Sequence, residues 1–140
     1  MPLQYSLLIV EDDLDTLDAL SRWFIRTGFD VTPVFHPRQA LSAATIKPFH
    51  VALIDYTLPE MDGLCLCQRL QRIVRDLRVI LLASHADPVL HGAAVDARVF
   101  SCVLKPFRLT DVERAVESAL EHQATTAAQA TTFMAETARA

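Results

Sequence analysis

The 140-residue sequence has no apolar segment near the ~18 residues that a membrane-spanning helix needs, and no cleavable targeting pattern at its N-terminus. It has only three cysteines, and this small, odd number favours reduced thiols over a framework of disulfide bonds. Together these absences predict a cytoplasmic protein that does not enter the membrane.

The sequence also lacks a basic stripe. Its net charge is −4, which argues against a nucleic-acid interface within this chain, and the arginines between 69 and 78 are expected on the solvent side of one helix. Apolar residues make up 51% and charged residues 21%, as in ordinary globular proteins. A chain of this length forms one domain that buries roughly two thirds of its unfolded surface, so it needs neither disulfides nor a structural metal.

Short, nearly continuous apolar runs alternate with longer segments of helical period. Runs without period-two alternation are typical of strands in a parallel sheet that helices cover on both faces. The expected strands are 7–10, 30–35, 51–54, 79–83 and 102–104. Pro33 cannot donate a hydrogen bond to a neighbouring strand, so the 30–35 strand is expected at an edge of the sheet.

The segments between these strands carry helix signals. Asp13, Asp87 and Thr110 are expected helix caps, with Thr110 and Glu113 forming a capping box, and Pro37 opens the second helix. The first helix should stop at Gly28. The residues expected to face the core at helical spacing are Leu14, Leu17, Leu20, Phe24, Leu41, Ala44, Leu66, Leu70, Ile73, Leu77, Val112, Val116 and Leu120. The alternation predicts a parallel α/β sheet with right-handed crossovers.

The composition changes after Gln123. Residues 124–140 are rich in Ala and Thr and low in charge, which indicates either a frayed extension of the last helix or a linker. The predicted organisation is therefore a domain over residues 1–123 followed by an Ala/Thr-rich tail or linker over 124–140.

Charged residues directly follow three of the expected strands. Glu11, Asp12 and Asp13 follow the first strand, Asp55 ends the third, and Lys105 follows the fifth. Ligands of an open doubly wound sheet bind outside the carboxyl ends of its strands, so these groups should meet at one rim. Carboxylates that lie close together repel unless a cation is bound among them. Mg²⁺ suits these carboxylates, and phosphate is the anion that suits Lys105. Asp55 is interpreted as a nucleophile that accepts a phosphoryl group.

The segments LLIVEDD, LIDYTLPEMDG and VLKPF resemble, in order and spacing, the signature blocks of bacterial response-regulator receiver domains. The resemblance covers residues 5 to about 123. It implies a flavodoxin-like α/β fold: a doubly wound five-stranded parallel sheet with strand order 2-1-3-4-5 and helices on both faces. It also implies phosphotransfer from a histidine kinase or a phosphotransfer protein. Such a domain is not a metabolic enzyme and catalyses at most its own phosphorylation and dephosphorylation.

The resemblance assigns a metal site residue by residue. Asp55 would be the phosphoacceptor and a ligand of Mg²⁺, Asp12 a direct ligand, and Thr57 a ligand through its backbone carbonyl. Glu11 would act mostly through water. Asp13 fits a helix cap better than a ligand.

The resemblance also assigns the surroundings of the phosphoryl group. Lys105 would pair with the phosphoryl oxygens, the backbone N–H of Ser84 could donate to them, and the family often has a cis peptide bond where this chain has Lys105–Pro106. Thr57 and His85 flank the path expected for an attacking water, so they should influence how long the phosphoryl group survives.

Two switch positions depart from the family. Receivers usually have Ser or Thr at the end of the fourth strand and Tyr or Phe three residues before the lysine, whereas this chain has Ala83 and Cys102. The hydroxyl of the adjacent Ser84 should point to the opposite face of the sheet. Phe100 is expected on the same face as Cys102, nearer the start of the strand. The sequence therefore predicts phosphorylation with a weakened or rerouted conformational response.

Alternatives come from different functional classes. One is a pseudo-receiver, a protein-interaction module that phosphorylation does not switch. The other is a phosphatase of the haloacid dehalogenase type, which is set aside because Thr57 stands where that family has a second acid and no cap domain is present.

Three further expectations concern packing and assembly. The fourth helix, fifth strand and last helix are expected to support weak self-association. Cys65 and Cys67 should face different sides of a helix, with Cys67 packed inward, which argues against a metal site there. Trp23 is expected to pack in the first helix.

Overall fold

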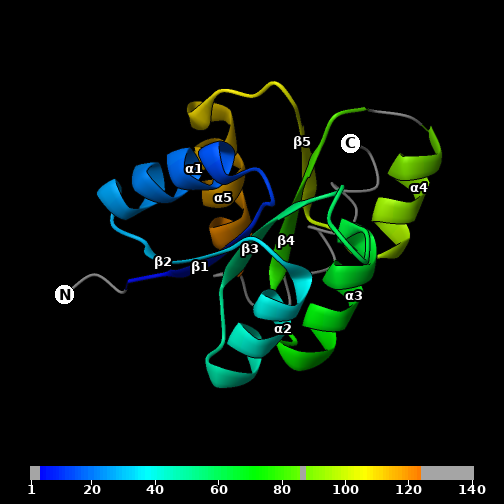
Figure 1. The fold of residues 1–140 in the computed structure, drawn as a ribbon, viewed down its shortest axis with the longest axis horizontal. Helices are drawn as coiled ribbons and strands as arrows, with labels where there is room; N and C mark the ends of the chain where they lie inside the picture. The colour runs from blue at the N-terminus through cyan, green and yellow to red at the C-terminus, as the bar shows by residue number, and fades with distance from the viewer. Residues whose placement is uncertain (1–3, 86–87, 124–140) are drawn as a thin grey trace.

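A computed structural model of the protein describes residues 4–85 and 88–123. These residues form a five-stranded parallel sheet with strand order β2-β1-β3-β4-β5, as predicted, with five helices around it (Figure 1). The elements are β1 (Ser6–Val10), α1 (Leu14–Arg26), β2 (Asp30–Val34), α2 (Pro37–Ile46), β3 (Val51–Asp55), α3 (Gly63–Ile73), β4 (Arg78–Ala83), α4 (Pro88–Asp96), β5 (Ser101–Leu104) and α5 (Leu109–Gln123).

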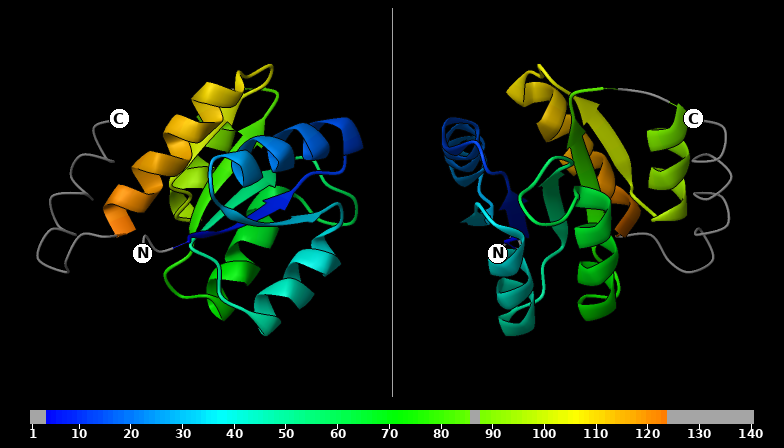
Figure 2. Two further views of the ribbon diagram at one scale, coloured as in Figure 1. Left: turned by 90° about the vertical axis from the view of Figure 1, so that its left-hand side faces the viewer. Right: turned by 45° about the vertical axis from the view of Figure 1, so that its right-hand side comes forward.

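The two faces of the sheet form two separate cores. Leu8 and Val10 pack with α2, α3 and α4, whereas Leu7 and Ile9 pack with α1 and α5. Figures 1 and 2 show the same division into layers. Because both faces are covered, β3 is buried along its whole length, which explains why its sequence has no polar alternation. Strand β2 is an edge strand, so Pro33 is tolerated there as predicted.

Most of the expected core positions are buried, but three predictions about helix faces were wrong. Leu14 is 63% exposed because the first turn of α1 begins at the rim of the sheet, and Ile73 is 43% exposed at the last residue of α3. Leu77 is buried but lies outside α3, since Val74 adopts an extended backbone that ends the helix. Side-chain periodicity identified the helices but not where they end.

The predicted capping box of α5 was also wrong. The helix begins at Leu109, so Thr110 lies inside its first turn, and Arg108 accepts the first helical hydrogen bonds through its carbonyl. Asp111 accepts a hydrogen bond from the Arg108 N–H (3.2 Å), which is the backward bond of a capping box shifted by two residues. The expected cap at Asp87 falls outside the described residues.

The packing predictions for the cysteines and Trp23 hold, but the arginines between 69 and 78 do not share one helix, because Arg75 follows the end of α3 and the half-buried Arg78 begins β4. Cys67 is buried and Cys65 is half-buried, and Trp23 packs against the α1/α5 core. Helix α1 ends before Gly28, which has a left-handed backbone (φ 101°). In the described ranges 4–85 and 88–123, none of the helices has the length and apolar character needed to cross a membrane.

Candidate functional site

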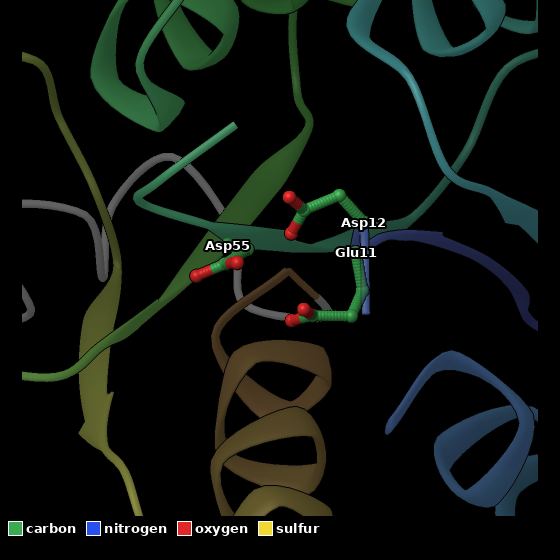
Figure 3. Close-up of side chains that lie close together, drawn as sticks. All are labelled: Glu11, Asp12 and Asp55. Atoms are coloured by element: carbon green, nitrogen blue, oxygen red, sulfur yellow. The ribbon is translucent and has the colours of Figure 1, made fainter. Parts of the chain in front are cut away.

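Three carboxyl groups meet at the carboxyl end of the sheet. Glu11 and Asp12 follow β1, and Asp55 ends the neighbouring strand β3, so the parallel pairing brings them together. Figure 3 shows the carboxyl groups of Glu11 and Asp12 reaching from the end of β1 toward Asp55. One oxygen from each lies within 4.8 Å of the others. Among the described residues, these three acidic side chains are the ones close enough together to hold a metal ion.

Lys105 neutralises part of this negative charge. Its Nζ lies 3.3 Å from Glu11 Oε2 and 3.3 Å from Asp55 Oδ1. The Glu11 side chain is fully buried and that of Asp55 nearly so, while Lys105 remains partly accessible. A buried carboxylate is costly unless it is paired, so Lys105 explains why the apolar strand β3 can end in an aspartate.

One lysine does not balance two buried carboxylates. Burial, followed by repulsion from Asp55, raises the pKa of Glu11 to about 7. Burial also raises the pKa of Asp55, although Lys105 opposes the change. Burial lowers the pKa of Lys105, but attraction to Glu11 and Asp55 outweighs it, so that pKa is raised. The site therefore favours binding a further cation or a proton.

The donor atoms fit a hard divalent cation. Glu11, Asp12 and Asp55 supply carboxylate oxygens, and Mg²⁺ prefers a few such oxygens and keeps several of its waters. Asp12 is exposed, which leaves room for those waters. No sulfur or imidazole group takes part among the described residues, so the chemistry of the donors matches Mg²⁺ better than a softer metal.

Backbone hydrogen bonds hold the loops of the site in place. The Tyr56 N–H donates to the Leu82 carbonyl (2.8 Å), and the Gly63 N–H donates to the Tyr56 carbonyl (2.8 Å), so both ends of the β3–α3 loop are anchored. The Lys105 N–H donates to the Ala83 carbonyl (2.8 Å), and the Lys105–Pro106 peptide bond is cis. The Asp13 N–H donates to Glu11 Oε1 (3.1 Å), and the Asp13 side chain accepts from the Thr16 hydroxyl at the start of α1.

The residues at the end of β4 face different cavities. Ala83 lines a cavity of about 240 Å³ with Tyr56, Thr57, His85 and residues of α3 and α4. Ser84 lines a second cavity of about 610 Å³ with residues of α1 and with Lys105. Ser84 therefore borders the cavity on the α1 side of the sheet, whereas Ala83 borders the cavity on the α4 side.

The expectation that Phe100 shares a face with Cys102 was wrong. Cys102 pairs in register with Leu81, which belongs to the core under α2, α3 and α4. Phe100 packs instead against the α1/α5 core. It precedes the first residue of β5, so strand alternation does not extend to it. Phe100 therefore cannot replace the missing aromatic residue at position 102.

Sequence reasoning missed two features of the β3–α3 loop. Glu60 has a left-handed backbone (φ 67°), and its carboxylate lies 3.2 Å from Arg38 Nε and 3.5 Å from His36 Nε2, which ties this loop to the start of α2. Tyr56 lines the cavity beside Ala83. The Pro59–Gly63 turn signal marked the loop, but no sequence pattern identifies pairs between separate loops.

Comparisons with known proteins agree with this geometry. The family profile described as response regulator receiver domain matches residues 7–117. The chain is 32% identical over 117 residues to the response regulator receiver protein CpdR of Brucella abortus (strain 2308). The aligned residues cover 81% of this chain and 95% of that protein.

Two other similar proteins show how much of a longer relative this chain covers and which fold it shares. The transcriptional regulatory protein PrrA of Mycobacterium tuberculosis is 28% identical over 120 residues, which are 86% of this chain but 52% of PrrA, so the chain spans about half of that relative. A solved CheY-like receiver domain protein from Methanospirillum hungatei JF-1 matches with a TM-score of 0.82 at 22% identity, covering 86% of this chain and 97% of that one.

Proposed function

We propose that Asp55 accepts a phosphoryl group, since the chain belongs to the family of response regulator receiver domains. The observation that carries the proposal is the contact of Lys105 with both Glu11 and Asp55 at 3.3 Å, beside the exposed Asp12. An oxygen of Asp55 attacks the phosphorus atom, and the bond from phosphorus to the donor breaks.

Each residue of the site has a proposed role in this transfer. Asp12, Asp55 and the backbone carbonyl of Thr57 would hold Mg²⁺, with Glu11 acting mostly through water, and the bound ion would neutralise charge on the transferring group. Lys105 turns from the carboxylates to the phosphoryl oxygens as negative charge arrives at Asp55. The backbone N–H of Ser84 donates to the same oxygens.

The proposed setting is a signalling pathway. The donor is a histidine kinase or a phosphotransfer protein in the cytoplasm, and the chain does no chemistry beyond its own phosphorylation and dephosphorylation. Residues 1–123 form the receiver domain, and residues 124–140 serve as a tail or linker. The composition change after Gln123 supports this boundary.

One observation favours a second candidate function. Ala83 and Cys102 replace the hydroxyl and the aromatic ring that usually couple phosphorylation to the α4 surface. A pseudo-receiver, which binds a partner without being switched, would keep the acidic site and lack these residues. The acceptor chemistry and the switch must therefore be tested separately.

The acceptor chemistry is tested by intact-mass measurement after incubation with acetyl phosphate and Mg²⁺. We expect the wild type to gain one phosphoryl group, Asp55→Asn to gain none, and chelation of Mg²⁺ to prevent the gain. Asp96→Asn, which removes an exposed carboxylate in α4, is the matched control and should gain the group normally. Equal mass gains in wild type and Asp55→Asn would falsify the proposal.

We also propose weak self-association through α4, β5 and α5. Val89 (82% exposed) and Val95 (56%) on α4 and Leu104 (46%) on β5 are apolar side chains on this surface. In sedimentation experiments the protein should show concentration-dependent dimers, with or without beryllofluoride, a mimic of the phosphoryl group. Val95→Glu should abolish them, whereas Ile25→Glu on α1 should not. A monomer at high concentration under both conditions would rule out the interface.

A further inference from the structure

The loop between β3 and α3 contains a turn with an unfavourable backbone conformation. The Met61 N–H donates to the Pro59 carbonyl (2.8 Å), which closes a three-residue γ-turn around Glu60. Glu60 has φ 67°, so this is the form of the γ-turn with positive φ, the rarer and more strained of the two. Glycine adopts such a backbone without strain, but glutamate does not. A strained residue of this kind persists only when its surroundings hold it in place.

The side chain of Glu60 makes contacts that can hold the turn. Its carboxylate lies 3.2 Å from Arg38 Nε and 3.5 Å from His36 Nε2. His36 is itself fixed, because its Nδ1 accepts a hydrogen bond from the Arg38 N–H (3.0 Å) at the start of α2. Since Nδ1 accepts, the ring proton is on Nε2, the nitrogen nearest the Glu60 carboxylate. We call the contacts of Glu60 with His36 and Arg38 the Glu60 clamp.

The Glu60 clamp joins two segments that strand pairing does not connect. Helices α2 and α3 lie side by side on one face of the sheet (Figure 2), and the clamp links the start of α2 to the loop that leads into α3. Leu58 and Met61, on either side of Glu60, also pack against the core on that face. This apolar packing keeps the loop on the domain, but it does not require a left-handed backbone at Glu60. The carboxylate contacts act on that residue itself.

The clamp can affect the acidic site because little chain lies between them. The Tyr56 backbone is fixed at both its N–H and its carbonyl by hydrogen bonds to other backbone groups. The γ-turn begins at Pro59, so only Thr57 and Leu58 lie between the fixed backbone and the turn. The Thr57 carbonyl is the backbone group assigned to Mg²⁺ in the proposed function. Its direction therefore depends on where the turn is held.

We propose that Glu60 is a positioning residue for Mg²⁺ binding: held by His36 and Arg38, it maintains the strained turn and so orients the Thr57 carbonyl toward the acidic site. The inference rests on the proposed function, because it uses the ligands assigned there. Removing a group that orients a metal ligand commonly weakens metal binding by about tenfold or more. The side chains of Glu60 and Arg38 are exposed, so their contact is weaker and a smaller loss is expected.

The test compares Glu60→Ala with Glu60→Gly in Mg²⁺ titrations of the full chain followed by backbone NMR. Glu60→Ala removes the clamp and keeps the strain of a left-handed backbone. The turn should open, and the dissociation constant for Mg²⁺ should rise about threefold to tenfold. Glu60→Gly removes the same charge but adopts the left-handed backbone without strain, so it should weaken Mg²⁺ binding no more than about twofold. In the metal-free proteins, the Met61 amide should exchange with solvent faster in Glu60→Ala than in Glu60→Gly.

Two further variants separate orientation of the carbonyl from a general loss of charge or stability. Glu121→Ala removes an exposed carboxylate from α5 and should leave Mg²⁺ binding unchanged. His36→Asn keeps a residue that caps helices well but removes the ring beside Glu60, so it should weaken Mg²⁺ binding less than Glu60→Ala does. Urea denaturation of each variant measures stability independently of Mg²⁺.

The outcomes distinguish this inference from the proposed function. Equal Mg²⁺ affinities in wild type and Glu60→Ala, whatever the change in stability, would overturn the inference, as would a wild type that binds no Mg²⁺. Equal losses in Glu60→Ala and Glu60→Gly would also overturn it, because the lost charge alone would explain them. If Mg²⁺ affinities follow the expected order but acetyl phosphate adds no phosphoryl group to the wild type, the inference is supported and only the proposed function is contradicted.

Discussion

Gly63→Ala should destabilise the domain by about 3 kcal/mol or more, the upper part of the range for overpacked positions. A Cβ atom at position 63 would lie 2.5 Å from the backbone oxygen of Asp55 and 2.9 Å from Cα of Tyr56. Both are backbone atoms that hydrogen bonds hold in place, so neither can move away as a flexible side chain could. Urea denaturation monitored by circular dichroism measures the free energy of unfolding.

The same substitution at Gly92 is the matched control. A Cβ atom there meets no atom within 4 Å, and Gly92 lies inside α4. Alanine favours a helix more than glycine does, so Gly92→Ala should leave the protein unchanged or stabilise it by about 0.5–1 kcal/mol. If both variants unfold at the urea concentration of the wild type, α3 does not pack against the Asp55 carbonyl as closely as described.

The close approach at Gly63 illustrates what the sequence does not reveal. Its pattern predicts the strands, the helices and the edge position of Pro33, because buried parallel strands are apolar throughout and proline cannot sit in the middle of a sheet. The Pro59–Gly63 segment also marks a turn. The glycine is needed because α3 begins against the backbone at the end of β3. This need depends on distances between elements, which no local sequence pattern contains.

The ends of helices were missed for a related reason. Leu77 has the right spacing to continue α3, but Val74 takes an extended conformation and Leu77 reaches the core from a loop. Thr110 and Glu113 match a capping box, yet the Arg108–Asp111 bond defines the start of α5. Side-chain periodicity persists beyond a helix when the following segment also packs on the core, so it locates elements better than it locates their ends.

The location of the acidic site was predictable because topology alone determines it. Parallel strands bring their carboxyl ends to one edge, so residues after β1, β3 and β5 meet whatever their side chains are. Which of these carboxylates is buried and which is exposed was not predictable. That Glu11 is fully buried while its neighbour Asp12 is exposed follows from the path of the β1–α1 loop, in which the Asp13 N–H binds the Glu11 carboxylate.

The structure adds detail to the prediction that phosphorylation causes a weakened conformational response. Ala83 is buried beside the 240 Å³ cavity under α4, and Ser84 faces the other side of the sheet, so no side-chain hydroxyl at these two positions faces that cavity. A hydrogen bond from a hydroxyl to a charged phosphoryl group contributes about 1.5–3 kcal/mol. If that bond forms only in the active state, its absence weakens the population shift by roughly tenfold to a hundredfold.

We therefore expect beryllofluoride to shift the backbone NMR signals of α4 and β5 only slightly in the wild type. The double variant Ala83→Thr, Cys102→Tyr restores the hydroxyl and the aromatic ring, and it should show large shifts across both elements. The added bulk has space, because Ala83 borders a cavity and Cys102 is exposed. Shifts around Asp55 should appear in both proteins, since the binding of beryllofluoride does not depend on the switch.

Ser84→Ala is the control for this comparison. It removes the neighbouring hydroxyl but keeps the backbone N–H, so it should respond to beryllofluoride as the wild type does. Large shifts across α4 and β5 in the wild type that the double variant does not enlarge would show that another route carries the signal. Tyr56, which lines the same cavity directly after Asp55, would then be the first residue to substitute. Small shifts in the wild type and in the double variant alike would instead favour the pseudo-receiver, because the usual coupling residues would be present without a response.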